Sequence, residues 1–275
     1  MMPDVDLAGQ KTGLRGFNRW WPLLLLAVFF IIVGGGYLAH YRVAPGITLA
    51  KLERLTINDI PPGSSLYIDN TDHEVQKGGS LTLELLPGDH TILGSADGYW
   101  PWKALVTLST SDTTIDAFFI PSHITIEPAN ASAKADIALR IKNYQLPSAA
   151  HPLLLLNGCE SVYLSENRII ADVPTAAGCT PAPFLCTDNS CAPTIIFSPV
   201  EPIASIIKYP GREDALLVSL GSHVYALALD PRDPRAFAPV LESRAPVVID
   251  GPNGSVVGKD LTTYFTLDFS THVRP

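Results

Sequence analysis

The sequence lacks the local motifs that commonly mark catalytic sites. It contains no G-x-S-x-G, no H-E-x-x-H, no glycine-rich loop ending in Lys-Ser/Thr, and no S-x-x-K accompanied by its partner motifs. Its seven histidines are dispersed, and no two of them lie at metal-ligand spacing. We therefore predict that the chain is not an enzyme and that it has no catalytic residues, no metal ligands and no cofactor.

Clusters of basic residues are also missing. The chain has 19 Lys and Arg against 27 Asp and Glu, and the basic residues form no patch of the kind that neutralises phosphates. Residues 230–235, Asp-Pro-Arg-Asp-Pro-Arg, are charge-balanced and spaced by proline, which indicates a solvated loop. We therefore do not expect nucleic acid as a partner.

Cysteine is scarce, and its spacing argues against zinc. The four cysteines are Cys159, Cys179, Cys186 and Cys191. They are separated by nineteen, six and four residues, whereas zinc sites use closely spaced pairs. A hairpin with its turn at Asp188-Asn189 would bring Cys186 and Cys191 within bridging range. We predict that disulfide, and Cys159–Cys179 as a second one, in an oxidising compartment.

Only one long hydrophobic run is present. From Trp20 to Ala39 about twenty residues carry no charge, enough to cross a hydrocarbon core of roughly 30 Å. Tryptophans open the run, and Tyr37 and Tyr41 lie at its far end, as in many membrane interfaces. The run predicts a transmembrane helix over residues 20–41, with the lipid bilayer as its partner. A cleaved signal peptide is the alternative.

Flanking charge predicts an orientation for this helix. Lys11, Arg15 and Arg19 precede the run, and only Arg42 follows within ten residues. The positive-inside rule then makes residues 1–19 a cytoplasmic tail and places the later domains outside the cytoplasm. The expected location is the cell membrane, crossed once, with the N-terminus in the cytoplasm.

The remaining sequence reads as β-structure. Its 24 prolines argue against long helices. After a connector, residues 42–54, short alternating runs are separated by Gly, Pro and Asp, which is typical of a compact antiparallel sandwich over residues 55–121.

The sandwich region carries a resemblance. Its landmarks are the tetrapeptide Pro61-Pro62-Gly63-Ser64, the corner Leu86–His90 and the pair Gly98-Tyr99. With these, residues 55–121 resemble a PEGA domain, a small bacterial β-sandwich of surface and envelope proteins. The residues that the resemblance assigns to the fold itself are Pro61, Gly63, Pro87, Gly88, Gly98 and Tyr99.

Residues 122–150 are predicted to be a linker, in which residues 131–144 fit either a short helix or a strand. Residues 151–275 again show short alternating runs typical of β-strands. Residues 204–242 alone contain four such runs, which is the size of one propeller blade. At this size residues 151–275 hold about three blades, fewer than a closed propeller needs. They resemble the propeller-like, or WD-repeat-like, regions that accompany an anchor and a PEGA domain in some bacterial envelope proteins. Open sheet edges favour self-association or a partner.

Three aromatic rings, Tyr99, Trp100 and Trp102, follow one glycine. Alternation along a strand would place Trp100 and Trp102 on the face opposite Tyr99. These two tryptophans are the candidate surface contact, for example with a cell-wall glycan. Packing of both tryptophans against the linker or the outer domain is the favoured interpretation.

The expected fold class is mainly β: a transmembrane helix, a small PEGA-like sandwich and an incomplete propeller-like region. The expected function is that of a non-catalytic, membrane-anchored envelope protein that mediates protein or cell-surface interactions. Its expected partner is another envelope protein or a second copy of itself. The alternatives are a cell-wall or peptide hydrolase with a dispersed site, and a small-ligand sensor that signals through a cytoplasmic partner.

Overall fold

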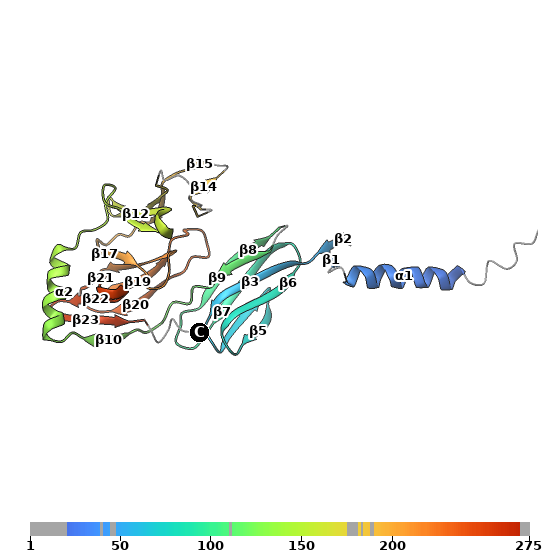
Figure 1. The fold of residues 1–275 in the computed structure, drawn as a ribbon, viewed down its shortest axis with the longest axis horizontal. Coiled ribbons are helices and arrows are strands. Elements are labelled where there is room, and N and C mark those ends of the chain that lie inside the picture. The colour runs from blue at the N-terminus through green and yellow to red at the C-terminus, as the bar shows by residue number, and fades with distance from the viewer. Residues whose placement is uncertain are drawn as a thin grey trace, which may run out of the picture.

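The computed structural model describes residues 21–38, 41–44, 48–109, 112–174, 181–182, 184–187 and 190–269. The chain is mainly β, as the sequence predicts. Figure 1 shows a helix, a β-sandwich and a larger group of sheets. The helix is α1 (Trp21–Leu38), and a hairpin of β1 (Tyr41–Ala44) and β2 (Thr48–Lys51) follows it.

The prediction of a membrane span over residues 20–41 is wrong. The described helix spans 18 residues, about 27 Å at 1.5 Å per residue, and strand β1 begins at Tyr41. Within the described ranges, no helix is both long and apolar enough to cross a membrane. The predicted single-pass location and orientation are therefore withdrawn, and residues 1–19, the expected cytoplasmic tail, lie outside the described residues.

The sandwich consists of two facing sheets. One has the order β6 (Gly79–Leu85), β3 (Glu53–Ile60), β9 (Thr113–Asp116), and the other β5 (Thr71–Val75), β4 (Ser64–Ile68), β7 (Gly88–Ser95), β8 (Trp102–Leu108). The period-two pattern of the sequence sends alternate side chains inward. Leu55 and Ile57 from β3 thus meet Leu66 and Ile92 from the opposite sheet in one buried core.

Three four-stranded sheets make up the rest of the chain, and we call them the stack. The first sheet has the order β11 (Leu153–Leu155), β12 (Glu160–Ser165), β13 (Arg168–Asp172), β16 (Thr194–Phe197). The second sheet is β17 (Ile203–Lys208), β18 (Ala215–Leu220), β19 (His223–Ala228), β20 (Phe237–Glu242). The third sheet is β21 (Pro246–Asp250), β22 (Val256–Asp260), β23 (Thr263–Asp268), β10 (Thr125–Pro128). Short 3-10 turns, η1 (Leu156–Gly158) and η2 (Pro252–Gly254), and a small hairpin of β14 (Cys186–Thr187) and β15 (Ser190–Cys191) lie between these strands.

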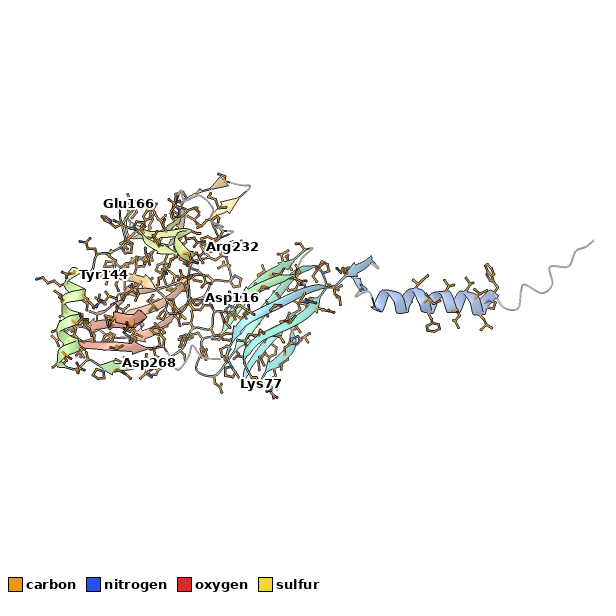
Figure 2. All side chains as sticks on the ribbon, viewed as in Figure 1. Lys77, Asp116, Tyr144, Glu166, Arg232 and Asp268 are labelled. Atoms are coloured by element: carbon orange, nitrogen blue, oxygen red, sulfur yellow. A yellow bond between two sulfur atoms is a disulfide. The ribbon has the colours of Figure 1, made fainter. Side chains whose placement is uncertain are left out.

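The segment predicted as a linker, residues 122–150, belongs to the stack. Strand β10 completes the third sheet by pairing with β23, and α2 (Ala131–Asn143) follows it (Figure 1). The helix begins there because the Asn130 side chain caps it, accepting from the Ala133 amide at 2.9 Å. Tyr144, at its other end (Figure 2), joins it to the second sheet through its hydroxyl, which lies 2.8 Å from the backbone oxygen of Ile206.

Packing places the second sheet in the middle of the stack. Side chains on one of its faces, including Leu216 and Val218, pack against the first sheet. Those on the opposite face, including Leu217 and Val240, share a core with the third sheet and the sandwich. The far face of the third sheet is covered by α2, whose Ile137 is 2% exposed. The sheets therefore lie in the order first, second, third, followed by the helix.

Candidate functional site

The sandwich and the stack meet through aromatic side chains and one arginine. The Phe118 ring lies 5.1 Å from that of Tyr209, which lies 5.4 Å from that of Phe269. Arg212 donates from Nη1 to the Ala117 carbonyl at 2.8 Å, and its guanidinium lies 4.7 Å from the Phe118 ring centre. These contacts fix the walls of a cleft between the two parts.

The two tryptophans predicted as a surface contact do not form a shared exposed surface. Trp102 is 7% exposed and packs 5.7 Å from the Phe119 ring inside the sandwich. Trp100 is 39% exposed, and its Nε1 donates to the Pro239 carbonyl of β20 at 2.9 Å. They separate because Trp100 pairs with Ile120 through its amide, at 2.8 Å, and β8 begins only at Trp102. Of the two tryptophans, only Trp100 faces the cleft with an accessible ring, and it contacts β20 of the outer domain.

The residues that the resemblance assigned to the fold lie at turns of the sandwich. Between β3 and β4, the Ser64 hydroxyl donates to the Pro61 carbonyl at 2.6 Å. The other turn residues are Gly63 after β3, Pro87 before β7, Gly88 at its first position, and Gly98 and Tyr99 before β8. Gly98 has a φ of 82°, which residues with a side chain rarely adopt. This turn directs Tyr99 onto Phe119, with the ring centres 6.0 Å apart.

The cleft beside Trp100 has a volume of about 160 Å³. Its walls are aromatic and aliphatic, and its charged side chains are two cations. The lining residues are Trp100, Pro101, Trp102, Lys103, Phe118, Ile120, Arg235, Ala236, Phe237 and Ala238. No carboxylate is among these described residues, so the cleft is suited to a negatively charged group.

Arg235 is the best-positioned charge in this cleft. Its Nε and Nη2 donate to the Ala228 carbonyl at 3.4 and 3.2 Å, and its guanidinium lies 5.7 Å from the Phe197 ring centre. Burial lowers the pKa of Arg235 to about 10, although Asp230 and Asp233 act against the shift. Among the described residues, no carboxylate lies within ion-pair distance of it. The sequence indicated a solvated loop here, because the burial of Arg235 depends on Phe197, far away in the chain.

Arg232, three residues earlier, shows the usual arrangement. Its guanidinium, labelled in Figure 2, donates from Nε and Nη2 to both carboxylate oxygens of Asp230, and its side chain is largely exposed. Its charge is therefore already satisfied within the loop. Arg235 differs in that its charge is half-buried and meets only a neutral acceptor.

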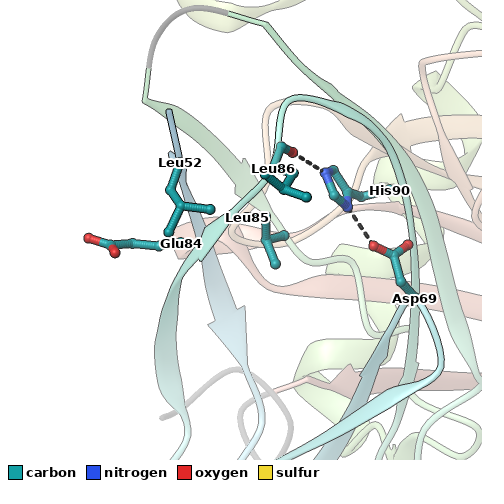
Figure 3. A pocket seen from close by; sticks show the side chains of 6 residues that line it. All are labelled: Leu52, Asp69, Glu84, Leu85, Leu86 and His90. Atoms are coloured by element: carbon teal, nitrogen blue, oxygen red, sulfur yellow. Dashed lines mark hydrogen bonds and ion pairs between the residues drawn. The ribbon is translucent and has the colours of Figure 1, made fainter. Parts of the chain in front are cut away.

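A second hollow lies beside β7 (Figure 3), and it contains a His–Asp pair. The Nδ1 atom of His90 faces an Asp69 carboxylate oxygen, and Nε2 faces the Leu86 carbonyl at 2.7 Å. Both ring nitrogens therefore have hydrogen-bond partners within the fold. Burial opposes the shift, but hydrogen bonds from His90 and the Thr91 amide lower the pKa of Asp69. The pair ties two turns together.

The described cysteines are disulfide-bonded. Cys186 and Cys191 form a disulfide across the β14–β15 hairpin, with Cα atoms 4.0 Å apart. Cys159 is also in a disulfide. Cys179 and the expected turn at Asp188-Asn189 lie outside the described residues, so the second pairing stays a prediction.

One buried carboxyl was not predicted. Glu160 is fully buried at the start of β12, and its Oε1 accepts from the Ala182 amide at 2.9 Å. Oε2 has no hydrogen-bond partner among the described residues, and burial raises the pKa of this carboxyl. Across the same part of the chain, no three His, Cys, Asp or Glu side chains gather as metal ligands would. Glu160 therefore belongs to no such cluster among the described residues.

Comparison of the sequence with protein-family models and with curated proteins found no match. The resemblances to a PEGA domain and to a propeller-like region therefore stay predictions. Function has to be argued from the cleft itself.

Proposed function

We propose that this chain is a non-catalytic protein-binding protein, and that the cleft beside Trp100 accepts one carboxylate-bearing side chain of an extended partner segment. The observation that carries the proposal is Arg235, a half-buried cation that faces a cleft without a carboxylate partner. A charge in such a place is stabilised best by an opposite charge that arrives with a ligand.

The size of the cleft favours a side chain over a free metabolite. Its volume is about 160 Å³, whereas pockets for drug-sized ligands measure about 300–1,000 Å³. One amino-acid side chain fits this volume. The small-ligand sensor is therefore the weaker reading.

The strand beside the cleft favours side-chain recognition over strand addition. β20 is an edge strand of the second sheet, and an edge strand can pair with an added strand. Pro239 lacks an amide hydrogen, and its carbonyl already accepts from Trp100. The partner would thus be held by its side chain, between the Trp100 ring and Arg235.

The test is selection of a displayed library of random linear peptides on the immobilised protein. We expect enrichment of Asp or Glu next to an apolar residue. Arg235→Gln should weaken binding of the selected peptides about tenfold or more, since a charge-assisted hydrogen bond is lost. Fluorescence anisotropy with labelled peptides measures this.

Arg232→Gln is the matched control, because Arg232 is exposed and already paired with Asp230. It should leave binding unchanged. Peptides without acidic residues, or equal binding to the Arg235→Gln variant, would contradict the proposed site. Cleavage of the selected peptides by the wild-type protein would contradict the non-catalytic function and favour the hydrolase alternative.

A further inference from the structure

The first sheet of the stack has one covered and one open face. Its inward side chains, including Val162, Ile169 and Ala171, are fully buried against the second sheet. Because side chains alternate along a strand, Tyr163 and Ile170 point to the opposite face. Among the described residues, none of the buried apolar cores includes Tyr163 or Ile170.

The open face is apolar along one row. Tyr163, Ile170 and Ile195 are paired neighbours on three adjacent strands, β12, β13 and β16. Ile195 is 49% exposed, and Leu154 on the next strand is 52% exposed. The row crosses the strands at right angles, and we call it the apolar row.

Opposite charges flank the apolar row symmetrically. On β13, Arg168 and Asp172 lie two residues before and two residues after Ile170, and so share its face. Each is about 7 Å along the strand from Ile170. The only ion pair of Arg168 among the described residues is a 3.7 Å contact with exposed Glu166, and Asp172 accepts the Val173 amide at 2.8 Å.

We propose that the open face is the interface of a homodimer, in which a second copy of the chain packs its own first sheet on this one. The two-fold axis runs along the apolar row, between the two sheets. Arg168 of each copy then faces Asp172 of the other, while Ile170 and Ile195 meet their own equivalents. The face is complementary to itself, as an isologous interface requires, and two packed sheets lie about 10 Å apart.

The other end of the stack explains why the assembly closes at two copies. Head-to-tail stacking would need an open outer face on the third sheet, and α2 covers that face. A chain with one open end forms a closed pair instead of a filament. This interface is separate from the cleft at Trp100 and does not depend on the ligand proposed there.

The experiment is site-directed crosslinking of the full chain. Ile195→Cys places a thiol on the axis, and a short bis-maleimide should join two copies into a dimer on a denaturing gel. Leu139→Cys, on the exposed side of α2, is the control and should give no dimer. Equal crosslinking at both positions would overturn the proposal.

Exchange of the charges at Arg168 and Asp172 tests the position of the two-fold axis. In the Ile195→Cys background, Arg168→Asp or Asp172→Arg alone should lower the crosslinked fraction about tenfold or more, because like charges then face each other twice. The double exchange should restore it. Failure to restore, in variants whose unfolding midpoint is that of the parent, would overturn the proposal. If Asp172→Arg disturbs the fold through Val173, a loss of crosslinking in folded Arg168→Asp supports the axis, and no loss refutes it.

Discussion

The two ends of the stack differ in whether the outer face of the last sheet is covered by other side chains. At the third sheet, Ile137 and Ile141 of α2 pack on Ile249 and Val257 of the outer face, and Ile249 and Val257 are buried. At the first sheet, Leu154 and Ile195 of the outer face are half exposed. Both faces are built from the same alternating strands, so the strands themselves do not decide which face is covered.

The difference arises from the chain segment that covers the third sheet. Thirteen residues of helix and the strand β10 come from the segment ahead of the first sheet, and they reach the third sheet from there. This segment covers the third sheet, and no described helix covers the first sheet. The stack is therefore closed at one end within the chain and left for a partner at the other.

The largest expected effect is at the capped end. Ile137→Ala should lower the free energy of unfolding by about 2–4 kcal/mol, because it removes a fully buried side chain and leaves a cavity. Urea unfolding followed by circular dichroism measures it. Leu139→Ala on the same helix is 58% exposed and should change stability by no more than about 0.5 kcal/mol. Equal effects would mean that α2 is not a cap.

Tyr144 provides the next test of the cap. Its hydroxyl donates to the Ile206 carbonyl and accepts from the Ile206 amide, both at 2.8 Å. Burial raises the pKa of Tyr144 to about 12, so the hydroxyl stays protonated and able to donate. Tyr144→Phe should cost about 1–3 kcal/mol, since two buried backbone groups lose their partner. A loss near zero in the same urea titration would show that the helix is held by apolar contacts alone.

Sequence patterns predicted the strands well, because alternating runs and turn residues are local features of the sequence. The four runs in residues 204–242 became β17 to β20, and turn residues such as Gly98 lie where the chain reverses. Residues 125–128 were expected to be a linker, since nothing local shows that they pair with residues 265–268. The same holds for α2, whose sequence fits either a helix or a strand. In the structure the helix is stabilised by the Asn130 cap and by packing of Ile137 on the third sheet.

The candidate site was beyond local prediction for the same reason. Trp100 and Trp102 would share a face in one continuous strand, but pairing of Trp100 with Ile120 separates them. The sequence predicts Arg235 to lie in a solvated loop, whereas in the structure Phe197 and residues of the sandwich lie around it. The membrane span was predicted from the apolar run alone, and within the described residues no helix is both long and apolar enough to cross a membrane.

A smaller effect is expected inside the open end, at Glu160. Burial raises the pKa of this carboxyl, so the folded state holds its proton at a pH where the unfolded chain has lost it. Stability therefore falls as the pH rises from the unfolded value of about 4.3 through the raised folded value. Glu160→Gln keeps an acceptor for the Ala182 amide and removes this dependence. Its stability relative to wild type should rise between pH 4 and pH 8. A difference that does not change with pH would contradict the assignment.

The smallest effect is expected on the open face itself. Leu154 and Leu155 are adjacent on β11, but Leu154 is 52% exposed and Leu155 is fully buried against the second sheet. Leu154→Ala should change the free energy of unfolding by no more than about 0.5 kcal/mol, whereas the buried reference Leu155→Ala should cost about as much as Ile137→Ala. The measurement is urea unfolding at a protein concentration low enough to keep the chain monomeric. A large loss in Leu154→Ala under those conditions would mean that the chain itself covers this face, and the contrast between the two ends of the stack would disappear.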